Sequence, residues 1–386
     1  MSTMVIVGAG VAGATAARTL RSAGFDGRVV LIGDEPEHPY RRPPLSKDVL
    51  LGRTAPERTR LWPPEHWAGH RIELRTGTRA VRLDTGRRLV GLADGSELAY
   101  DRLLLATGGR ARRLPAAEGL EGVHTLRTLA DAARLRAALV PGTRVLVVGG
   151  GLIGAEVAAT ARTLGCPVTV LEPEPYPLAR VLPPPVARLF ASLHRRQGVD
   201  LRTGIALERL KRTDHGAFVA TGTDGRRWTA DVVVVAIGMR PCTALADAAG
   251  LTTGDGIVVN EHAGTSAPGV FAAGDVASRP NPLLGGRYRA EHWQAAQEQG
   301  AAAAHAMLGR PARPPRVPWC WSDQYGVNLQ ICGWPEAGDD IRFDGDPDGM
   351  DFTAAFHRGG LMTGAVSVNR PKEMRALRER VERPLL

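Results

Sequence analysis

The sequence has few cysteines, and none is placed where it could form a local redox pair with another. Its 386 residues include four, and no two of them stand in a CxxC or CxxxxC arrangement: Cys166, Cys242, Cys320 and Cys332. The sequence therefore argues against a dithiol that stores two electrons within the chain. So few cysteines, with no signal-peptide pattern at the N-terminus, favour a reducing, cytoplasmic location.

Long apolar runs and blocks of positive charge are also missing. No apolar run approaches the roughly 20 residues that span a bilayer, so the sequence predicts no membrane segment. The formal net charge is +9, but there is no Lys/Arg-rich run and no nucleic-acid-binding module, which argues against a nucleic-acid partner. Lysine is rare, and the chain has only Lys47, Lys211 and Lys372. A surface rich in arginine would steer an acidic protein partner.

Glycine, by contrast, is plentiful, and it forms two fingerprints, the first near the N-terminus. The segment GAGVAG at residues 8–13 follows an apolar run at residues 4–7 that predicts a buried parallel strand. In this pattern Gly8 makes a tight turn, Gly10 lets the backbone approach a pyrophosphate and Gly13 lets the helix pack closely on the strand. The positive end of the following helix would then face the phosphates.

Two acidic residues follow the next predicted strand. The apolar run at residues 29–32 ends shortly before Asp34 and Glu35, where a carboxylate can accept hydrogen bonds from the ribose of an adenosine. We favour Asp34 for this contact, with Glu35 as the alternative. The competing interpretation, a glycine-rich turn without a ligand, is disfavoured by the complete order of strand, turn, helix, strand and acid.

A second fingerprint of the same kind lies further along the chain. The segment GGGLIG at residues 149–154 follows a strand-like run, and the next strand-like run ends at Glu172. A carboxylate there accepts from the 2′-hydroxyl of NADH and repels the 2′-phosphate of NADPH, although Arg180 nearby leaves room for some NADPH tolerance. A solvated strand end is the alternative for Glu172. The nucleotide contacts predicted within the fingerprint are Gly149, Gly151, Leu152, Ile153 and Gly154.

Further segments resemble a known superfamily. They are PYRRPPLSK at residues 39–47, ATGG at 106–109, AIGMRP at 236–241 and a strand-like run at 265–275 that ends in Gly-Asp. With the two fingerprints, they resemble the two-dinucleotide-binding flavoprotein reductases of the glutathione-reductase-like superfamily over nearly the whole chain. The resemblance implies FAD at the first fingerprint and NADH at the second. It also implies nucleotide contacts at Arg42, Lys47, Val81, Ala106, Thr107, Gly108, Arg110, Gly238, Gly274, Asp275, Glu291, His292, Trp293 and Trp321.

Lys47 and Glu156 are the predicted catalytic pair. The Pro-Pro-Leu-Ser-Lys motif resembles the ferredoxin-reductase branch of the superfamily, in which such a lysine lies beside flavin N5 and bonds a glutamate of the second fingerprint helix. For Glu156, the alternative is a favourable charge near a helix N-terminus. We expect Ser46 to cap the short helix that carries Lys47.

The segment WCWSDQY at residues 319–325 narrows the resemblance to the oxygenase-coupled ferredoxin reductases, which include those for putidaredoxin, rhodocoxin and biphenyl dioxygenase. Cys320 stands where that family usually has an aromatic residue. Trp319 and Trp321 share one face of a predicted strand. Either both pack over the flavin pocket, or Trp321 lies at its rim, where a partner docks, and Trp319 lies within. We favour the second arrangement.

The predicted fold class is α/β, with two Rossmann-like dinucleotide-binding domains and a small α+β C-terminal domain. The expected boundaries are residues 1–114 and 238–309 for the two parts of an FAD-binding domain, 115–237 for the NAD-binding domain and 310–386 for the C-terminal domain. The implied function is electron transfer from NADH through FAD to an acidic iron–sulfur ferredoxin that serves a cytochrome P450 or ring-hydroxylating oxygenase. The alternatives are a rubredoxin reductase, an NADH oxidase or quinone reductase, and a signalling flavoprotein like apoptosis-inducing factor.

Overall fold

The computed structural model describes residues 2–281, 285–311 and 316–383. Its first sheet is parallel, and its central strands are apolar and buried, which is typical of strands that are covered on both faces. In spatial order the strands are β20 (Val270–Ala272), β7 (Arg102–Leu105), β1 (Thr3–Val7), β2 (Arg28–Ile32) and β3 (Ile72–Arg75). Because β20 comes from far along the chain, this sheet is completed only after the second parallel sheet has been traversed.

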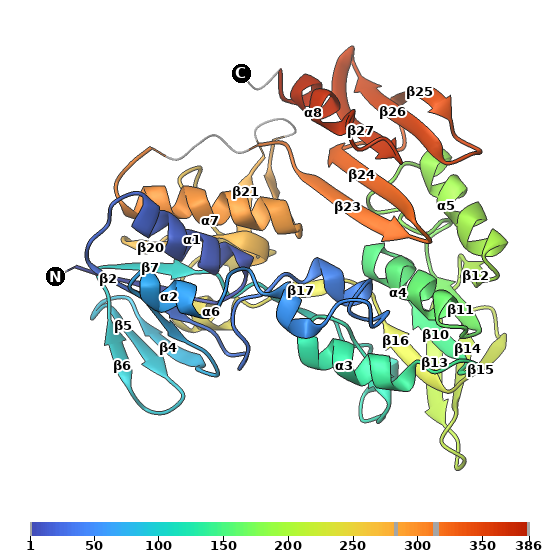
Figure 1. The fold of residues 1–386 in the computed structure, drawn as a ribbon, viewed down its shortest axis with the longest axis horizontal. Helices are drawn as coiled ribbons and strands as arrows, with labels where there is room; N and C mark the ends of the chain where they lie inside the picture. Colours follow the sequence, from blue (N-terminus) through green and yellow to red (C-terminus); the bar gives the residue numbers. More distant parts are fainter. Residues whose placement is uncertain (1, 282–284, 312–315, 384–386) are drawn as a thin grey trace.

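Two helices pack against each other beside this sheet. They are α1 (Val11–Ser22), which follows the first fingerprint, and α7 (Trp293–Met307), as Figure 1 shows. Their backbones approach closely at Gly300, where a Cβ atom would lie 2.2 Å from the carbonyl oxygen of Ala12. This close contact needs a glycine, and it brings the two helix N-termini to one site.

A second parallel sheet repeats the arrangement. In spatial order its strands are β12 (Asp200–Thr203), β11 (Val168–Glu172), β10 (Val145–Val148), β16 (Val232–Val235) and β9 (Val123–His124). Its associated helices are α3 (Leu129–Ala138), α4 (Leu152–Thr163) and α5 (Pro184–Arg196). In Figure 1 the two parallel sheets lie at opposite ends of the molecule's long axis, so any site between them is shared by both.

Three smaller sheets are separate from the two parallel ones. One group comprises β4 (Ala80–Asp84), β5 (Leu89–Leu92) and β6 (Glu97–Ala99), and another β13 (Leu207–Arg212), β14 (Phe218–Gly222) and β15 (Arg227–Ala230). A four-stranded group holds β18 (Thr253–Gly254), β19 (Gly256–Val258), β21 (Ala277–Pro280) and β22 (Arg287–Tyr288). The small helices are α2 (Glu65–Gly69) and α6 (Ala244–Ala248), with 3₁₀ turns η1 (Pro43–Ser46), η2 (Pro56–Thr59), η3 (Pro115–Ala117) and η4 (Gly274–Val276).

The chain crosses between the two parallel sheets along one antiparallel pair of strands. These are β8 (Gly109–Ala111) and β17 (Met239–Pro241), whose residues Arg110 and Arg240 are register partners. The pair begins at the end of the ATGG segment and includes the last three residues of the AIGMRP segment. The two crossings therefore run side by side.

The last part of the chain forms a five-stranded antiparallel sheet. Its order is β23 (Trp319–Gln324), β24 (Val327–Gly333), β27 (Leu361–Val368), β26 (Asp351–Arg358) and β25 (Asp340–Asp346). Apolar side chains of one face pack against α5, and those of the other pack against α8 (Met374–Glu382). The predicted fold class is confirmed, whereas the domain boundaries stay a prediction. Within the described ranges, no helix is both long and apolar enough to cross a bilayer.

Candidate dinucleotide-binding and redox site

Both glycine fingerprints open into one cavity of about 520 Å³. A volume of this order suits a small-molecule or cofactor site. The predicted contact residues that line the cavity are Gly8, Gly10, Asp34, Glu35, Arg42, Lys47, Ala106, Thr107, Gly108, Gly149, Gly151, Leu152, Ile153, Glu156, Glu172, Arg180, Gly238, Gly274, Asp275, Glu291, His292, Trp293 and Trp321. Most of the residues singled out from the sequence are thus brought together in space.

Four predicted contacts do not line the cavity. Gly13 and Gly154 sit inside their helices, where each packs against the turn before it. Val81 lies on β4 and is 53% exposed, outside the cavity wall. Arg110 lies on β8 with a side chain that is 67% exposed, and its guanidinium is 3.9 Å from Asp34. For these four, direct contact with a nucleotide stays a prediction.

The geometry of the first fingerprint fits a pyrophosphate. Gly8 has a backbone φ of +113°, which residues other than glycine rarely adopt. A Cβ atom there would also lie 2.1 Å from the carbonyl oxygen of Ala106. A Cβ at Gly13 would lie 1.9 Å from the carbonyl oxygen of Gly8. At Gly10, by contrast, a Cβ would meet no atom within 4 Å, and the residue lines the cavity. The turn therefore leaves backbone open to an anion at the N-terminus of α1.

The second fingerprint repeats this geometry. Gly149 has φ of +102°, and a Cβ there would lie 2.5 Å from the carbonyl oxygen of Ala236. Gly154 packs against Gly149, while Gly151 faces open space at the N-terminus of α4. The cavity therefore has two similar anion-binding ends, which is what two dinucleotides require.

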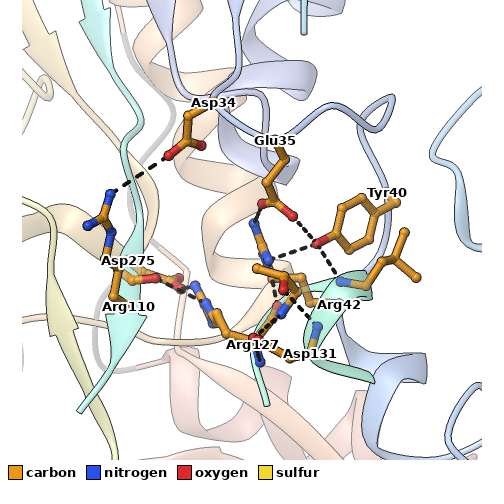
Figure 2. Close-up of polar contacts among 11 residues, drawn as sticks. Asp34, Glu35, Tyr40, Arg42, Arg110, Arg127, Asp131 and Asp275 are labelled. Atoms are coloured by element: carbon orange, nitrogen blue, oxygen red, sulfur yellow. Dashed lines mark hydrogen bonds and ion pairs between the residues drawn. The ribbon is translucent and has the colours of Figure 1, made fainter. Parts of the chain in front are cut away.

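Glu35 and Asp34 differ in their surroundings. Glu35 accepts hydrogen bonds from the Tyr40 hydroxyl and from Arg42 Nη2, each at 2.5 Å, as Figure 2 shows. Burial and the neighbouring Glu35 raise the pKa of Tyr40. Burial by itself would lower the pKa of Arg42, but the nearby Tyr40 and Glu35 raise it above its ordinary value. Asp34 is 59% exposed, and its ion pair is with Arg110. Glu35 is therefore already well supplied with donors, while Asp34 is freer to accept them from a ligand.

Arg127 is a cavity residue that sequence reasoning missed. Its Nη2 donates to Asp275 at 2.6 Å (Figure 2). Its Nε donates to the carbonyl oxygen of Gly109. The residue directly precedes the capping box of α3, in which Thr128 and Asp131 satisfy each other's backbone N–H groups. The sequence signal was that Thr-x-x-Asp box, because an arginine just before a helix N-terminus is well placed to meet an anion.

The predicted pair of Lys47 and Glu156 is present as an ion pair. Lys47 Nζ lies 2.8 Å from Glu156 Oε2, and the two side chains are 14% and 3% exposed. Ser46 and Ser322 both donate to the same carboxylate, Ser322 at 2.7 Å. The expectation that Ser46 caps a helix is wrong: it ends the 3₁₀ turn η1, and its hydroxyl turns to Glu156 instead. Thus Glu156 is a buried, fully partnered group.

Glu172 is held by the turn of its own fingerprint. Its carboxylate accepts from the backbone N–H of Gly150 at 2.5 Å and from that of Glu174 at 2.9 Å. The residue is 7% exposed, so the alternative of a solvated strand end is wrong. Since Glu172 lines the cavity, as Gly151 does, a carboxylate is fixed where the second nucleotide would bind. Its contact with a ribose stays a prediction.

Tryptophans line the far wall of the cavity. Trp321 lines the cavity and packs edge-on against Trp293, with ring centroids 6.2 Å apart. Trp319 stacks on Trp321 at 5.2 Å and does not itself line the cavity. The expectation that Trp319 lies within the pocket is therefore wrong, because of these two stacked rings only Trp321 lines the cavity. Cys320 and His292 also line this wall. Burial by itself would lower the pKa of His292, but the neighbouring Cys320 raises it, and the pKa lies above its ordinary value.

These features together define a class of protein. One cavity with two Rossmann-type anion-binding ends and a buried Lys–Glu pair between them is the site of a two-dinucleotide oxidoreductase. Residues 2–300 match the family described as pyridine nucleotide-disulphide oxidoreductase, and residues 319–384 match a reductase C-terminal domain. The chain belongs to the pyridine nucleotide-disulphide oxidoreductase family. Membership confirms the prediction of FAD and NAD(H) as cofactors.

Relatives resemble the chain over nearly its full length. Putidaredoxin reductase from Pseudomonas putida is 41% identical, with 96% of this chain and 89% of that protein covered. The ferredoxin–NAD(+) reductase component of the anthranilate 1,2-dioxygenase system from Burkholderia cepacia is 43% identical, with coverages of 97% and 92%. The crystal structure of a covalent putidaredoxin reductase–putidaredoxin complex superimposes with a TM-score of 0.95 at 39% identity, covering 98% of this chain and 93% of that chain. The resemblance to oxygenase-coupled reductases is confirmed.

Proposed function

We propose that this protein is an NADH:ferredoxin oxidoreductase that supplies electrons to an oxygenase. The observation that carries the proposal is the single cavity shared by both glycine fingerprints, with Lys47 and Glu156 paired in its wall. Bound FAD would supply the chemistry, since it accepts a hydride from NADH and can release the electrons one at a time. The relatives named as ferredoxin–NAD(+) reductases support the same conclusion.

The residues of the first fingerprint would hold the FAD. Gly10 gives the pyrophosphate access to the backbone, and the N-terminus of α1 favours its negative charge. Arg127 and Asp275 are paired at the cavity wall, so the arginine is ready to meet a phosphate and the aspartate a hydroxyl of the ribityl chain. Asp34 or Glu35 would accept hydrogen bonds from the adenosine ribose.

Lys47 and Glu156 would act on the reacting end of the nucleotides. The ammonium of Lys47 is fixed by Glu156 and by the carbonyl oxygen of Pro43, at 3.3 Å, so it cannot swing away from the cavity. A fixed charge in a largely buried wall stabilises charge that develops during hydride transfer without reorganising. The two residues therefore keep one cation in place where the nicotinamide and flavin rings would meet.

Electrons must leave this site without a dithiol. The segment at residues 37–47 that lines the cavity contains no cysteine, and all four cysteines are free. An external acceptor is therefore needed, and the relatives act with ferredoxins by name. The chain's net charge of +9 favours an acidic iron–sulfur ferredoxin, and Trp321 is our candidate for the docking rim.

The domain division and the cellular location belong to the same proposal. We place the boundaries at residues 1–114, 115–237, 238–309 and 310–386. The β8–β17 pair supports them, because it joins a strand that precedes the second parallel sheet in the sequence to a strand that follows it. Four free cysteines and a reaction fed by NADH support a reducing compartment, and we propose the cytoplasm.

The test is the choice of electron acceptor. Holoprotein is mixed with NADH and cytochrome c, with and without an acidic iron–sulfur ferredoxin. We expect rapid cytochrome c reduction only when the ferredoxin is present, and little turnover with rubredoxin, a quinone or oxygen. Equal reduction without the ferredoxin, or faster turnover with one of the other acceptors, would contradict the proposal.

A further inference from the structure

A chain of buried polar side chains runs from Glu156 to the packed face between α5 and β23. Ser322 donates to Glu156 Oε1 at 2.7 Å, and Gln324 Nε2 donates to Ser322 Oγ at 3.0 Å. Gln324 Oε1 lies 2.8 Å from His194 Nε2, and His194 Nδ1 lies 3.1 Å from the Tyr325 hydroxyl. Glu156, His194, Ser322 and Gln324 are each at most 2% exposed. No step of the proposed reaction uses the part of this chain beyond Glu156.

The negative charge of Glu156 fixes the direction of every link. A carboxylate carries no hydrogen, so the single hydrogen of Ser322 must point to it, and the Ser322 oxygen must accept from Gln324. The amide of Gln324 then presents NH₂ to Ser322 and its carbonyl to His194, whose Nε2 must therefore carry a hydrogen. Burial lowers the pKa of His194 to about 4, so the ring is neutral and its bare Nδ1 accepts from Tyr325.

We infer that Ser322, Gln324 and His194 are positioning residues, which form a one-directional chain of donors that holds the Glu156 carboxylate against Lys47. The chain joins α5, β23 and α4 at the point where η1 delivers Lys47 to the cavity. Each buried group has its partner only in this one order, so the order stabilises a single rotamer of Glu156. The effect on Lys47 rests on the proposed function, whereas the direction of the chain does not.

The inference makes a sharp prediction for E156Q. Lys47 is a donor only, so the new amide must turn its oxygen to Lys47 and its NH₂ to Ser322. The buried Ser322 hydrogen then needs a new acceptor, and Gln324 is its other partner in the chain. For Ser322 to donate to Gln324, the Gln324 amide must flip, and its NH₂ then meets His194 Nε2, which must be bare. The hydrogen of His194 therefore moves from Nε2 to Nδ1, although the polar partners of His194 are Gln324 and Tyr325 and not residue 156.

The first experiment records the tautomer of His194 by long-range ¹H–¹⁵N NMR on ¹⁵N-histidine-labelled holoprotein, with H194Q to assign the signals. We expect neutral Nε2–H at pH 7 in the wild type and Nδ1–H in E156Q. D323N is the matched control, because it makes the same carboxylate-to-amide change at the residue that separates Ser322 from Gln324 in the sequence. Asp323 accepts from Asn328 and is not part of the chain of donors, so the tautomer of His194 should stay Nε2–H. A wild-type ring that is Nδ1–H or doubly protonated, or a tautomer that E156Q leaves unchanged, overturns the inference. If E156Q does not fold, the wild-type spectrum alone decides.

The second experiment asks whether the chain positions Lys47. In S322A, flavin reduction by NADH should slow by about tenfold at saturation, the scale of one hydrogen bond to a charged group, with a smaller change in KM. S322T keeps the hydroxyl and should restore the rate, while S367A, a buried serine of the same sheet that bonds the Arg370 carbonyl, should leave it unchanged. An equal loss in S322T, or none in S322A, overturns the positioning role. If the wild type reduces no ferredoxin but His194 shows the expected tautomers, that result contradicts only the proposed function and leaves the direction of the chain in place.

Discussion

Lys47 occupies a position that sets it apart from the other lysines of the chain. It follows the 3₁₀ turn that Pro43 and Pro44 begin, and its side chain is only 14% exposed. Lys372, in contrast, lies on the surface. Because arginine supplies nearly all other positive charge, the choice of lysine here fits a compact ammonium beside a reacting ring.

Replacement of Lys47 should therefore slow the reductive half-reaction. In Lys47→Ala, flavin reduction by NADH in stopped flow should fall by about tenfold to a thousandfold, the scale for removing one preorganised electrostatic group. Lys372→Ala, the matched surface change, should keep the wild-type rate. An unchanged rate in both Lys47→Ala and Glu156→Ala would remove the pair from the mechanism.

Glu172 should decide between NADH and NADPH. A carboxylate near a 2′-phosphate costs on the order of 1–4 kcal/mol at intermediate dielectric, so kcat/KM should favour NADH by roughly tenfold to several-hundredfold. Glu172→Arg should narrow or invert this ratio, while Glu208→Arg, on the exposed part of β13, should not. Equal efficiency with both nucleotides in the wild type would show that the carboxylate bound to Gly150 does not meet the ribose.

His194 should make the protein less stable in mild acid. Burial lowers its pKa to about 4, against about 6.5 in an unfolded chain, so between these values only the unfolded chain binds the proton. The stability it contributes is complete above pH 6.5 and is lost as the pH falls toward 4, by about 3 kcal/mol. His194→Gln should narrow the drop in thermal midpoint between pH 7 and pH 5. The exposed His262→Gln should not, and an identical drop in His194→Gln would rule out His194 as the cause.

At the scale of elements, the two strand–turn–helix units were readable from local pattern. Apolar β-branched runs predicted β1 and β10, and the glycine spacing predicted the turns, because both signals depend only on neighbouring residues. The ATGG and AIGMRP segments, which lead into β8 and β17, were singled out by the family resemblance. Local sequence patterns were sufficient to predict these elements, because each of them depends on the backbone conformation of neighbouring residues.

The fingerprint turns make a prediction that separates folding from binding. Gly13→Ala puts a Cβ 1.9 Å from the Gly8 carbonyl, so it should destabilise the fold by roughly 1–3 kcal/mol or more. Gly10→Ala meets no protein atom within 4 Å, so it should keep the fold and weaken FAD binding. Thermal midpoints with and without added FAD measure both effects, with Gly69→Ala as the control in open space. Normal FAD retention in Gly10→Ala would contradict the assignment of this turn to the pyrophosphate.

Contacts between distant elements were not readable in this way. Arg127 meets Asp275 across 148 positions, and Ser322 meets Glu156 across 166, so no local pattern announces either contact. The order of Trp319 and Trp321 was wrong for the same reason: period two places both on one face, but only packing against Trp293 decides which reaches the cavity. Ser46 was misread because a serine near a helix end fits a cap, and its real partner lies on α4.

At the scale of the whole molecule, Glu156 joins three parts of the chain. Lys47 comes from the segment after β2, Glu156 from the helix of the second fingerprint and Ser322 from the C-terminal sheet. A change at this junction therefore affects both sheets and the C-terminal part. The arrangement explains how one cavity can be built from segments so far apart in the sequence.

The net charge leads to a prediction about partner recognition. Ferredoxin reduction should slow as salt rises, because attraction between exposed charges is screened over about 8–10 Å at physiological ionic strength. Reduction of a small neutral quinone should change less. Trp321→Ala should impair ferredoxin reduction and spare flavin reduction by NADH, whereas Trp62→Ala, beside Arg18 of α1, should do neither. A ferredoxin rate that is flat across salt and indifferent to Trp321→Ala would reject this docking surface.

The most direct test of the central claim is one anaerobic double-mixing experiment. Holoprotein is first reduced with one equivalent of NADH, and an oxidised acidic iron–sulfur ferredoxin is then added in twofold excess while flavin and iron–sulfur absorbance are followed together. We expect each flavin to be reoxidised as two ferredoxins are reduced, because the chain has no cysteine pair to hold the electrons. A flavin that stays reduced in the presence of the ferredoxin would contradict the account.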